Sequence, residues 1–114
     1  MVRVTILETL KDEILKKFLG ESKIIFKQMY SLKENPNKGK LLGNVGGIVI
    51  KELKYRNFRF YFITDGYKLK LMEESHLVTL LIRFVRMSDK KDQQKTINEI
   101  KEILINFGPK GFNK

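Results

Sequence analysis

One short stretch of the chain concentrates side chains that can bind phosphate. Its basic residues are Lys51, Lys54, Arg56 and Arg59. Arginine presents a planar fork of N–H donors that matches a phosphate, and lysine supplies a compact positive charge. Together they can bind a phosphodiester and stabilise the negative charge that develops when it is attacked. A second basic segment, residues 83–91, contains Arg83, Arg86, Lys90 and Lys91.

Alternation in the aromatic segment divides its side chains between two faces. Between residues 57 and 64, Phe58, Phe60 and Phe62 alternate with Arg59 and Tyr61. Because successive side chains of a strand point to opposite faces, we predict that the phenylalanines enter the core while Arg59 and Tyr61 share the other face. That face either binds phosphate or is a solvated surface on which the arginine stacks against the tyrosine. The sequence leaves both alternatives open.

The composition excludes several other chemistries. The 114 residues include no cysteine and one histidine, His76, which rules out thiol nucleophiles, zinc–thiolate sites and mechanisms with two imidazoles. No glycine-rich nucleotide-binding loop is present, so we expect no cofactor. The net charge of +10 favours a polyanionic partner: RNA, DNA, an anionic membrane or an acidic protein. Without a long apolar run or a signal peptide, we expect a soluble, cytoplasmic protein.

The spacing of apolar residues predicts the elements that position the basic groups. We expect strands at residues 2–7, 45–53, 57–64 and 77–86. Helical spacing predicts a helical hairpin between the first two strands, with a buried stripe of Leu10, Ile14, Phe18, Ile25, Met29 and Leu32. A last helix, capped by Ser88-Asp89, has its apolar face at Ile97, Ile100, Leu104 and Phe107.

The segment 57–72 allows two interpretations. In one, Asp65-Gly66 closes a hairpin between two short strands. In the other, one long strand runs through it with a bulge at Asp65-Gly66. We favour the long strand, which pairs Tyr61 near Val85.

These elements predict an α+β fold with the order β-α-α-β-β-β(-β)-α. We expect an antiparallel-rich sheet with a helical hairpin packed on one face and a C-terminal helix. Residues 1–107 are assigned to this single domain, and residues 108–114 to a mobile C-terminal tail.

Several short motifs occur in a particular order along the chain. The helical hairpin ends in ENPNKGKLLGN at residues 34–44, and the next strand ends in Glu52-Leu53-Lys54. An aromatic strand follows, Phe58-Arg59-Phe60-Tyr61-Phe62, and the basic segment 83–91 precedes the last helix. In order and spacing these motifs resemble the RelE/ParE/HigB superfamily of toxins from type II toxin–antitoxin pairs, with the HigB-like branch nearest.

The resemblance implies a RelE-like fold and a metal-independent endoribonuclease that cuts ribosome-bound mRNA and inhibits translation. In this chemistry the ribose 2′-hydroxyl attacks the adjacent phosphate, which leaves a cyclic phosphate and a free 5′-hydroxyl. This reaction needs a base, cations and a proton donor, and it needs no cofactor. The implied partners are mRNA, the ribosome and a cognate antitoxin protein. We expect no binding to a membrane.

Specific positions follow from the resemblance. It implies catalytic roles for Arg59, the main phosphate-binding group, for Lys54 or Lys51 on the preceding strand, and for Arg83 or Arg86 at the end of the last strand. On the same basic surface we predict RNA contacts for Lys51, Arg56, Tyr61, Lys90 and Lys91. The tyrosine that some RelE members have near the last helix is missing from residues 89–94. Two alternatives stay open: a ParE-like toxin that inhibits gyrase, and a non-catalytic domain that binds RNA or DNA.

Overall fold

The protein is an α+β domain built on a five-stranded mixed sheet, as seen in a computed structural model that describes residues 1–75 and 77–112. Its strand order is β1-β5-β4-β3-β2. The elements are β1 (Val2–Ile6), α1 (Glu8–Phe18), α2 (Ser22–Tyr30), β2 (Lys40–Val45), β3 (Ile48–Tyr55), β4 (Phe58–Asp65), α3 (Gly66–Leu71), β5 (Leu80–Asp89) and α4 (Gln93–Phe107). Three short 3₁₀ turns lie at Leu19–Glu21, Ser31–Lys33 and Pro109–Phe112. His76, which we expect in an exposed turn, lies outside the described residues.

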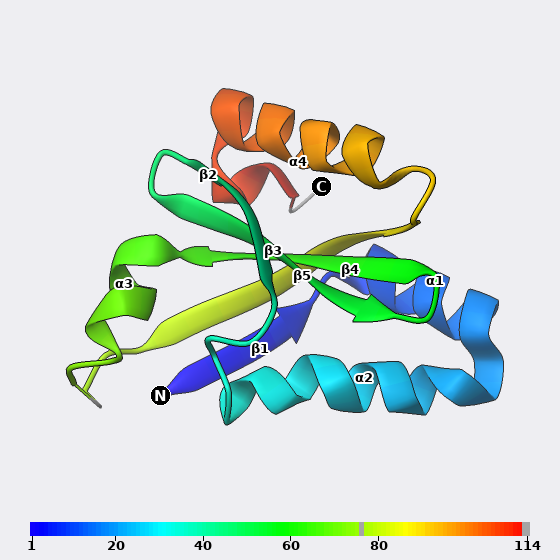
Figure 1. Ribbon diagram of the computed structural model, residues 1–114, viewed down its shortest axis with the longest axis horizontal. Coiled ribbons are helices and arrows are strands. Elements are labelled where there is room, and N and C mark those ends of the chain that lie inside the picture. Colours follow the sequence, from blue (N-terminus) through cyan, green and yellow to red (C-terminus); the bar gives the residue numbers. More distant parts are fainter. Residues whose placement is uncertain (76, 113–114) are drawn as a thin grey trace.

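Helices cover both faces of the sheet (Figure 1). On one face, α1 and α2 bury Ile14 and Ile25 against Phe60 and Phe62. On the other, α4 buries Ile100 and its neighbours against the face that carries Tyr61, Ile63 and Val85. The predicted division of β4 between its phenylalanine face and its Arg59–Tyr61 face is therefore confirmed. The helices in the described part of the chain are too short or too polar to cross a membrane.

The edges of the sheet differ from expectation. β1 pairs with β5 in parallel, with Val2 opposite Leu80, while the other strand pairs are antiparallel. β2 was not predicted, because Lys40, Gly43 and Asn44 give it little strand character. It nevertheless pairs antiparallel with β3, to which the turn at Gly46-Gly47 connects it. Between β4 and β5, Tyr61 pairs with Arg86, next to Val85 as predicted, and the register shifts between Tyr61 and Phe62.

Neither interpretation of residues 57–72 is correct. β4 ends at Asp65 and α3 begins at Gly66. The Asp65 carboxylate caps this helix by accepting hydrogen bonds from the backbone N–H groups of Tyr67 and Lys68, each at 3.0 Å. Asp-Gly is typical of hairpin turns, and the same aspartate is equally suited to a helix N-cap.

The C-terminal segment also differs from expectation. Phe107, predicted on the buried face of α4, is 61% exposed, whereas Phe112 is 3% exposed. Gly108 adopts a positive φ of 71° and ends the helix, after which the turn Pro109–Phe112 returns Phe112 to the α4 side of the core. Residues 108–112 are therefore packed on the domain, and residues 113–114 lie outside the description. At the other end of α4, β5 continues through Asp89, and the helix begins only at Gln93.

Candidate functional site

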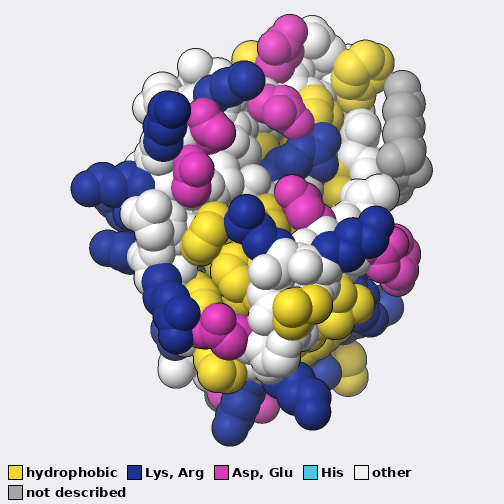
Figure 2. All heavy atoms as spheres, turned by 90° about the vertical axis from the view of Figure 1, so that its right-hand side faces the viewer, with side chains coloured by type: hydrophobic (Ala, Val, Ile, Leu, Met, Phe, Trp, Pro, Cys, Tyr) yellow, Lys and Arg dark blue, Asp and Glu magenta, His cyan; other side chains and the backbone are white. Residues whose placement is uncertain are grey.

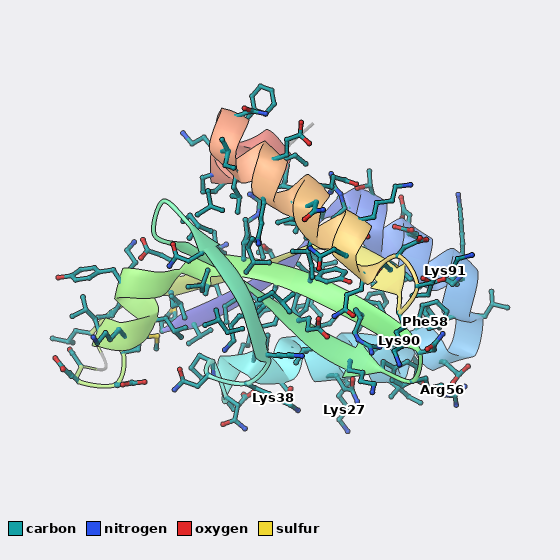
Figure 3. All side chains as sticks on the ribbon, turned by 45° about the horizontal axis from the view of Figure 1, so that its top comes forward. Lys27, Lys38, Arg56, Phe58, Lys90 and Lys91 are labelled. Atoms are coloured by element: carbon teal, nitrogen blue, oxygen red, sulfur yellow. The ribbon has the colours of Figure 1, made fainter. Side chains whose placement is uncertain are left out.

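A groove of about 580 Å³ opens where β3 extends beyond the first residue of β2. Segments from α2, the loop before β2, β3, β4 and the start of α4 line it. The lining residues are Gln28, Lys38, Gly39, Lys40, Glu52, Leu53, Lys54, Arg59, Lys90 and Gln93. We call it the lysine groove, after Lys38, Lys40, Lys54 and Lys90. Figure 3 shows labelled cations in an arc from the segment before β2 to the loop between β5 and α4.

The sheet register brings the basic residues of β3 and β4 together. Lys54 lies directly opposite Arg59, and Glu52 lies opposite Tyr61. Because pairs of facing residues share one side of the sheet, Glu52, Lys54 and Arg59 all lie on the face that α4 covers in part. Lys90 reaches the same groove because β5 ends one residue earlier, beside the β3–β4 turn.

A buried ion pair forms the floor of the groove. The Arg59 Nε atom lies 3.1 Å from Oε2 of Glu52, and both side chains are less than one tenth exposed. The other carboxylate oxygen, Oε1, accepts a hydrogen bond of 2.7 Å from the side-chain amide of Gln93. Burial of these two groups is tolerated because each has a polar partner. The charge of Arg59 is therefore largely balanced before any ligand arrives.

Part of the Arg59 guanidinium remains open to the groove. Its Nη1 atom makes one long contact, 3.5 Å, to the carbonyl oxygen of Phe58. Nη2 has no hydrogen-bond partner among the described residues. Every buried side-chain nitrogen in that part of the chain does have one. Nη2 therefore reaches solvent, and since Arg59 lines the groove, it can donate to a ligand there.

The lysines give the groove its charge. Among the described residues, Lys38, Lys40, Lys54 and Lys90 form no ion pair, while Glu52 is the only carboxylate in the lining. Four lysines around one neutralised ion pair create a positive potential inside a concave groove. Such a groove attracts a polyanion more strongly than scattered surface charges do.

Lys51 is not part of this groove, contrary to its predicted RNA contact. It alternates onto the opposite face of β3, where it is 6% exposed, and it pairs across the strands with Phe62. Its ammonium group donates a 2.9 Å hydrogen bond to the backbone carbonyl oxygen of Asn37. Burial lowers the pKa of the Lys51 ammonium below its ordinary value.

Tyr61 is also out of reach of RNA. It lies on the predicted face, but α4 closes over it and leaves it 0% exposed. Its hydroxyl is 2.7 Å from the hydroxyl of Ser88. Burial raises the pKa of the Tyr61 phenol, and the hydrogen bond to Ser88 opposes this change. Tyr61 thus acts as a core residue.

Two further predicted RNA contacts lie outside the groove, at the end of the molecule formed by the β3–β4 turn and the loop between β5 and α4. Arg56, in the β3–β4 turn, is exposed and forms an ion pair of 2.7 Å with Glu21. Lys91 is exposed beside Lys90 but does not line the groove. Figure 2 views this end and shows Lys and Arg side chains around an apolar patch. Phe18 and Phe58 meet edge to face near this end, with ring centroids 5.0 Å apart.

Arg83 and Arg86, predicted as catalytic, lie elsewhere on the α4 face. Arg83 donates a hydrogen bond of 3.3 Å to the carbonyl oxygen of Pro109 and lines a separate apolar pocket of about 170 Å³. Arg86 forms an ion pair of 2.7 Å with Glu99 and lies over the Phe112 ring, 5.3 Å from its centroid. The structure therefore brings Arg59, Lys54 and Lys90 together and separates them from these two arginines.

Several groove residues were not predicted from the sequence. Lys38 and Lys40 lie in the ENPNKGK segment, where their charge alone could have drawn attention to them. Glu52 belongs to the Glu52-Leu53-Lys54 motif but was not assigned a role, and Gln93 gave no signal, because both depend on contacts between distant strands and α4.

The comparisons with known proteins add no relative. Family models, curated proteins and solved structures give no significant match to this chain. Within residues 1–75 and 77–112, no group of three or more His, Cys, Asp and Glu side chains is arranged to hold a metal ion.

Proposed function

We propose that the protein is the toxin of a type II toxin–antitoxin pair, with a RelE-like fold, and that it cuts ribosome-bound mRNA without a metal. The observation that carries the proposal is the convergence of Lys38, Lys40, Lys54 and Lys90 around the Arg59–Glu52 pair in one groove. The motif order described above supports the same family.

The groove contains the groups that RNA cleavage by internal transfer needs. In the proposed reaction the 2′-hydroxyl attacks the adjacent phosphorus, and its proton passes to the Glu52 carboxylate. Arg59 Nη2 and the lysines stabilise the charge of the five-coordinate phosphorus. The bond to the 5′-oxygen then breaks, and a lysine ammonium, from Lys54 or Lys90, protonates the leaving oxygen. The products are a 2′,3′-cyclic phosphate and a 5′-hydroxyl.

A second candidate function is RNA binding without cleavage. The observation that favours it is the ion pair itself, because Glu52 balances the charge of Arg59 and leaves only Nη2 for a phosphate. In this version the lysines hold the RNA backbone, and Arg59 is a structural residue.

The test is cleavage of a defined message by the purified protein, with and without ribosomes. We expect cuts with 5′-hydroxyl ends that require ribosomes. Arg59→Ala should lower the rate by about 10²-fold or more, as expected when one preorganised donor is lost. Because this variant leaves Glu52 buried and unpaired, Arg59→Lys, which keeps the charge, is measured beside it.

A matched pair of lysine variants separates the groove from general charge. Lys54→Ala removes a groove lysine, and Lys70→Ala removes an exposed lysine on α3 that does not line the groove. Only the first should slow cleavage. An intact message combined with loss of gyrase supercoiling would identify a ParE-like toxin. An intact message that is nevertheless bound with steep salt dependence would favour the binding function.

The proposed partner is an antitoxin protein that neutralises the basic groove. Expression in a bacterium without such a partner should arrest growth, and the Arg59→Lys variant should relieve the arrest. Normal growth with the folded wild-type protein present would contradict the proposal.

A further inference from the structure

A chain of three polar side chains joins α4 to the floor of the lysine groove. The Gln93 amide nitrogen lies 2.7 Å from Oε1 of Glu52, and Oε2 of Glu52 lies 3.1 Å from Nε of Arg59. The three residues come from α4, β3 and β4. Each oxygen of the carboxylate therefore has a different partner.

This division of partners determines which part of Arg59 is available. A carboxylate beside an arginine prefers to bind two nitrogens of the guanidinium with its two oxygens. Here the contact between the two groups joins Oε2 of Glu52 to Nε of Arg59, while Oε1 accepts the hydrogen bond from Gln93. Nη2, the nitrogen that a bidentate pair through Nε would occupy, is left open to the groove.

We infer that Gln93 is a positioning residue: by holding one oxygen of Glu52, it prevents a bidentate pair and keeps Nη2 of Arg59 free for a phosphate in the groove. The inference rests on the proposed function, since it concerns how Arg59 meets the scissile phosphate. Gln93 needs no contact with the RNA for this role.

The chain contains a matched control next to Gln93. Gln94 has the same side chain and lies in the same helical turn, but it is exposed and donates its hydrogen bond to Asn98, at 3.0 Å. Gln93→Met and Gln94→Met remove the same amide group from the same turn, and only the first removes a partner of Glu52.

The first experiment uses the free protein. Hydrogen exchange of the Arg59 guanidinium is followed by NMR, with the signals assigned by their loss in Arg59→Lys. In Gln93→Met, Glu52 should close on Nη2, so the Nη hydrogens should exchange severalfold more slowly than in the wild type. Gln94→Met should match the wild type. A purely structural role for Gln93 predicts the opposite, because loosening of the site speeds exchange.

The second experiment measures cleavage of a defined message on ribosomes. Gln93→Met should lower kcat by about 10-fold to 10²-fold with little change in KM, because the lysines still bind the RNA. Combined with Arg59→Lys, it should cause little further loss, since both changes remove the same contact.

The outcomes separate this inference from the proposed function. Unchanged or faster Nη exchange in Gln93→Met, or additive losses in the double variant, would overturn the positioning role. If the wild type leaves every message intact, the nuclease proposal fails, while the exchange comparison on the free protein still decides for or against Gln93.

Discussion

The ammonium nitrogen of Lys51 lies 2.9 Å from the carbonyl oxygen of Asn37, and this contact ties the loop before β2 to the middle of β3. The same ammonium lies over the Phe62 ring, 5.9 Å from its centroid. The loop continues directly into Lys38 and Lys40 of the lysine groove. A buried lysine on one face of the sheet thus fixes two exposed lysines at its edge.

Lys51 should give stability a recognisable pH dependence. Its pKa is lowered by burial, so between that pKa and 10.5 the unfolded chain binds more protons than the folded one. Stability contributed by this group therefore rises with pH through that window and is lost as pH falls through the folded pKa. We expect the unfolding free energy of the wild type to rise relative to that of Lys51→Met over this range. Urea unfolding of both proteins at several alkaline pH values measures the difference, and parallel pH curves would contradict it.

The close packing of Gly39 predicts a sensitive position in the same loop. A Cβ atom at this residue would lie 2.8 Å from Cζ of Phe62, and the φ angle of +106° is one that only glycine adopts easily. Gly39→Ala should lower the free energy of unfolding by about 1–3 kcal/mol and reduce RNA affinity by displacing Lys38.

Gly20 serves as the control for this substitution. A Cβ atom there meets nothing within 4 Å, and its φ lies outside the left-handed range. Gly20→Ala should leave stability unchanged or slightly raised. Equal losses in both variants, measured by urea unfolding, would show that Gly39 has no special role.

RNA affinity should depend on salt through the groove lysines. Each lysine that contacts a phosphate releases a counterion, so Lys54→Ala and Lys90→Ala should each reduce the slope of log K against log salt by about 0.7 for single-stranded RNA. Lys70→Ala should leave the slope unchanged, because that lysine does not line the groove. Fluorescence anisotropy with a labelled RNA at a series of salt concentrations gives these slopes. A similar decrease in all three variants would indicate general charge attraction without a defined groove.

The C-terminal turn should contribute strongly to stability. Phe112 is buried against the α4 side of the core, so Phe112→Ala should cost about 3–5 kcal/mol. Phe107→Ala, at a largely exposed position, should cost less than about 1 kcal/mol. Thermal or urea unfolding of the two variants makes the comparison. Similar small losses in both would show that the turn is dispensable.

The features that the sequence predicted well are those that depend on neighbours along the chain. The two faces of β4 follow from alternation, and the stripe of the helical hairpin follows from helical spacing, so both were confirmed. Lys51 was assigned to RNA because the register of β3 against β4 cannot be read from one strand. That register places it beside Phe62, in the core.

The other differences between the predicted and the observed site arise from side-chain burial and from contacts between residues distant in sequence. Tyr61 is on the predicted face, but only the packing of α4 decides that it is buried and not exposed to a ligand. The basic segment 83–91 was expected to act as one surface, yet only Lys90 lines the lysine groove, because β5 carries the two arginines along the α4 face away from it. Roles such as that of Gln93 require three elements to meet and leave no trace in local composition.

The parallel pairing of β1 with β5 has a consequence for biosynthesis. Val2 needs Leu80 as its partner, and the N-terminal ammonium group donates to the carbonyl oxygen of Val78 at 2.9 Å. β1 can thus pair only after β5, the last strand in chain order, has been made, and contacts so distant in sequence form slowly. Lys90 and Gln93 of the groove are synthesised later still. The lysine groove can therefore be complete only after residue 93 has been made, well after the Glu52 and Arg59 pair that forms its floor.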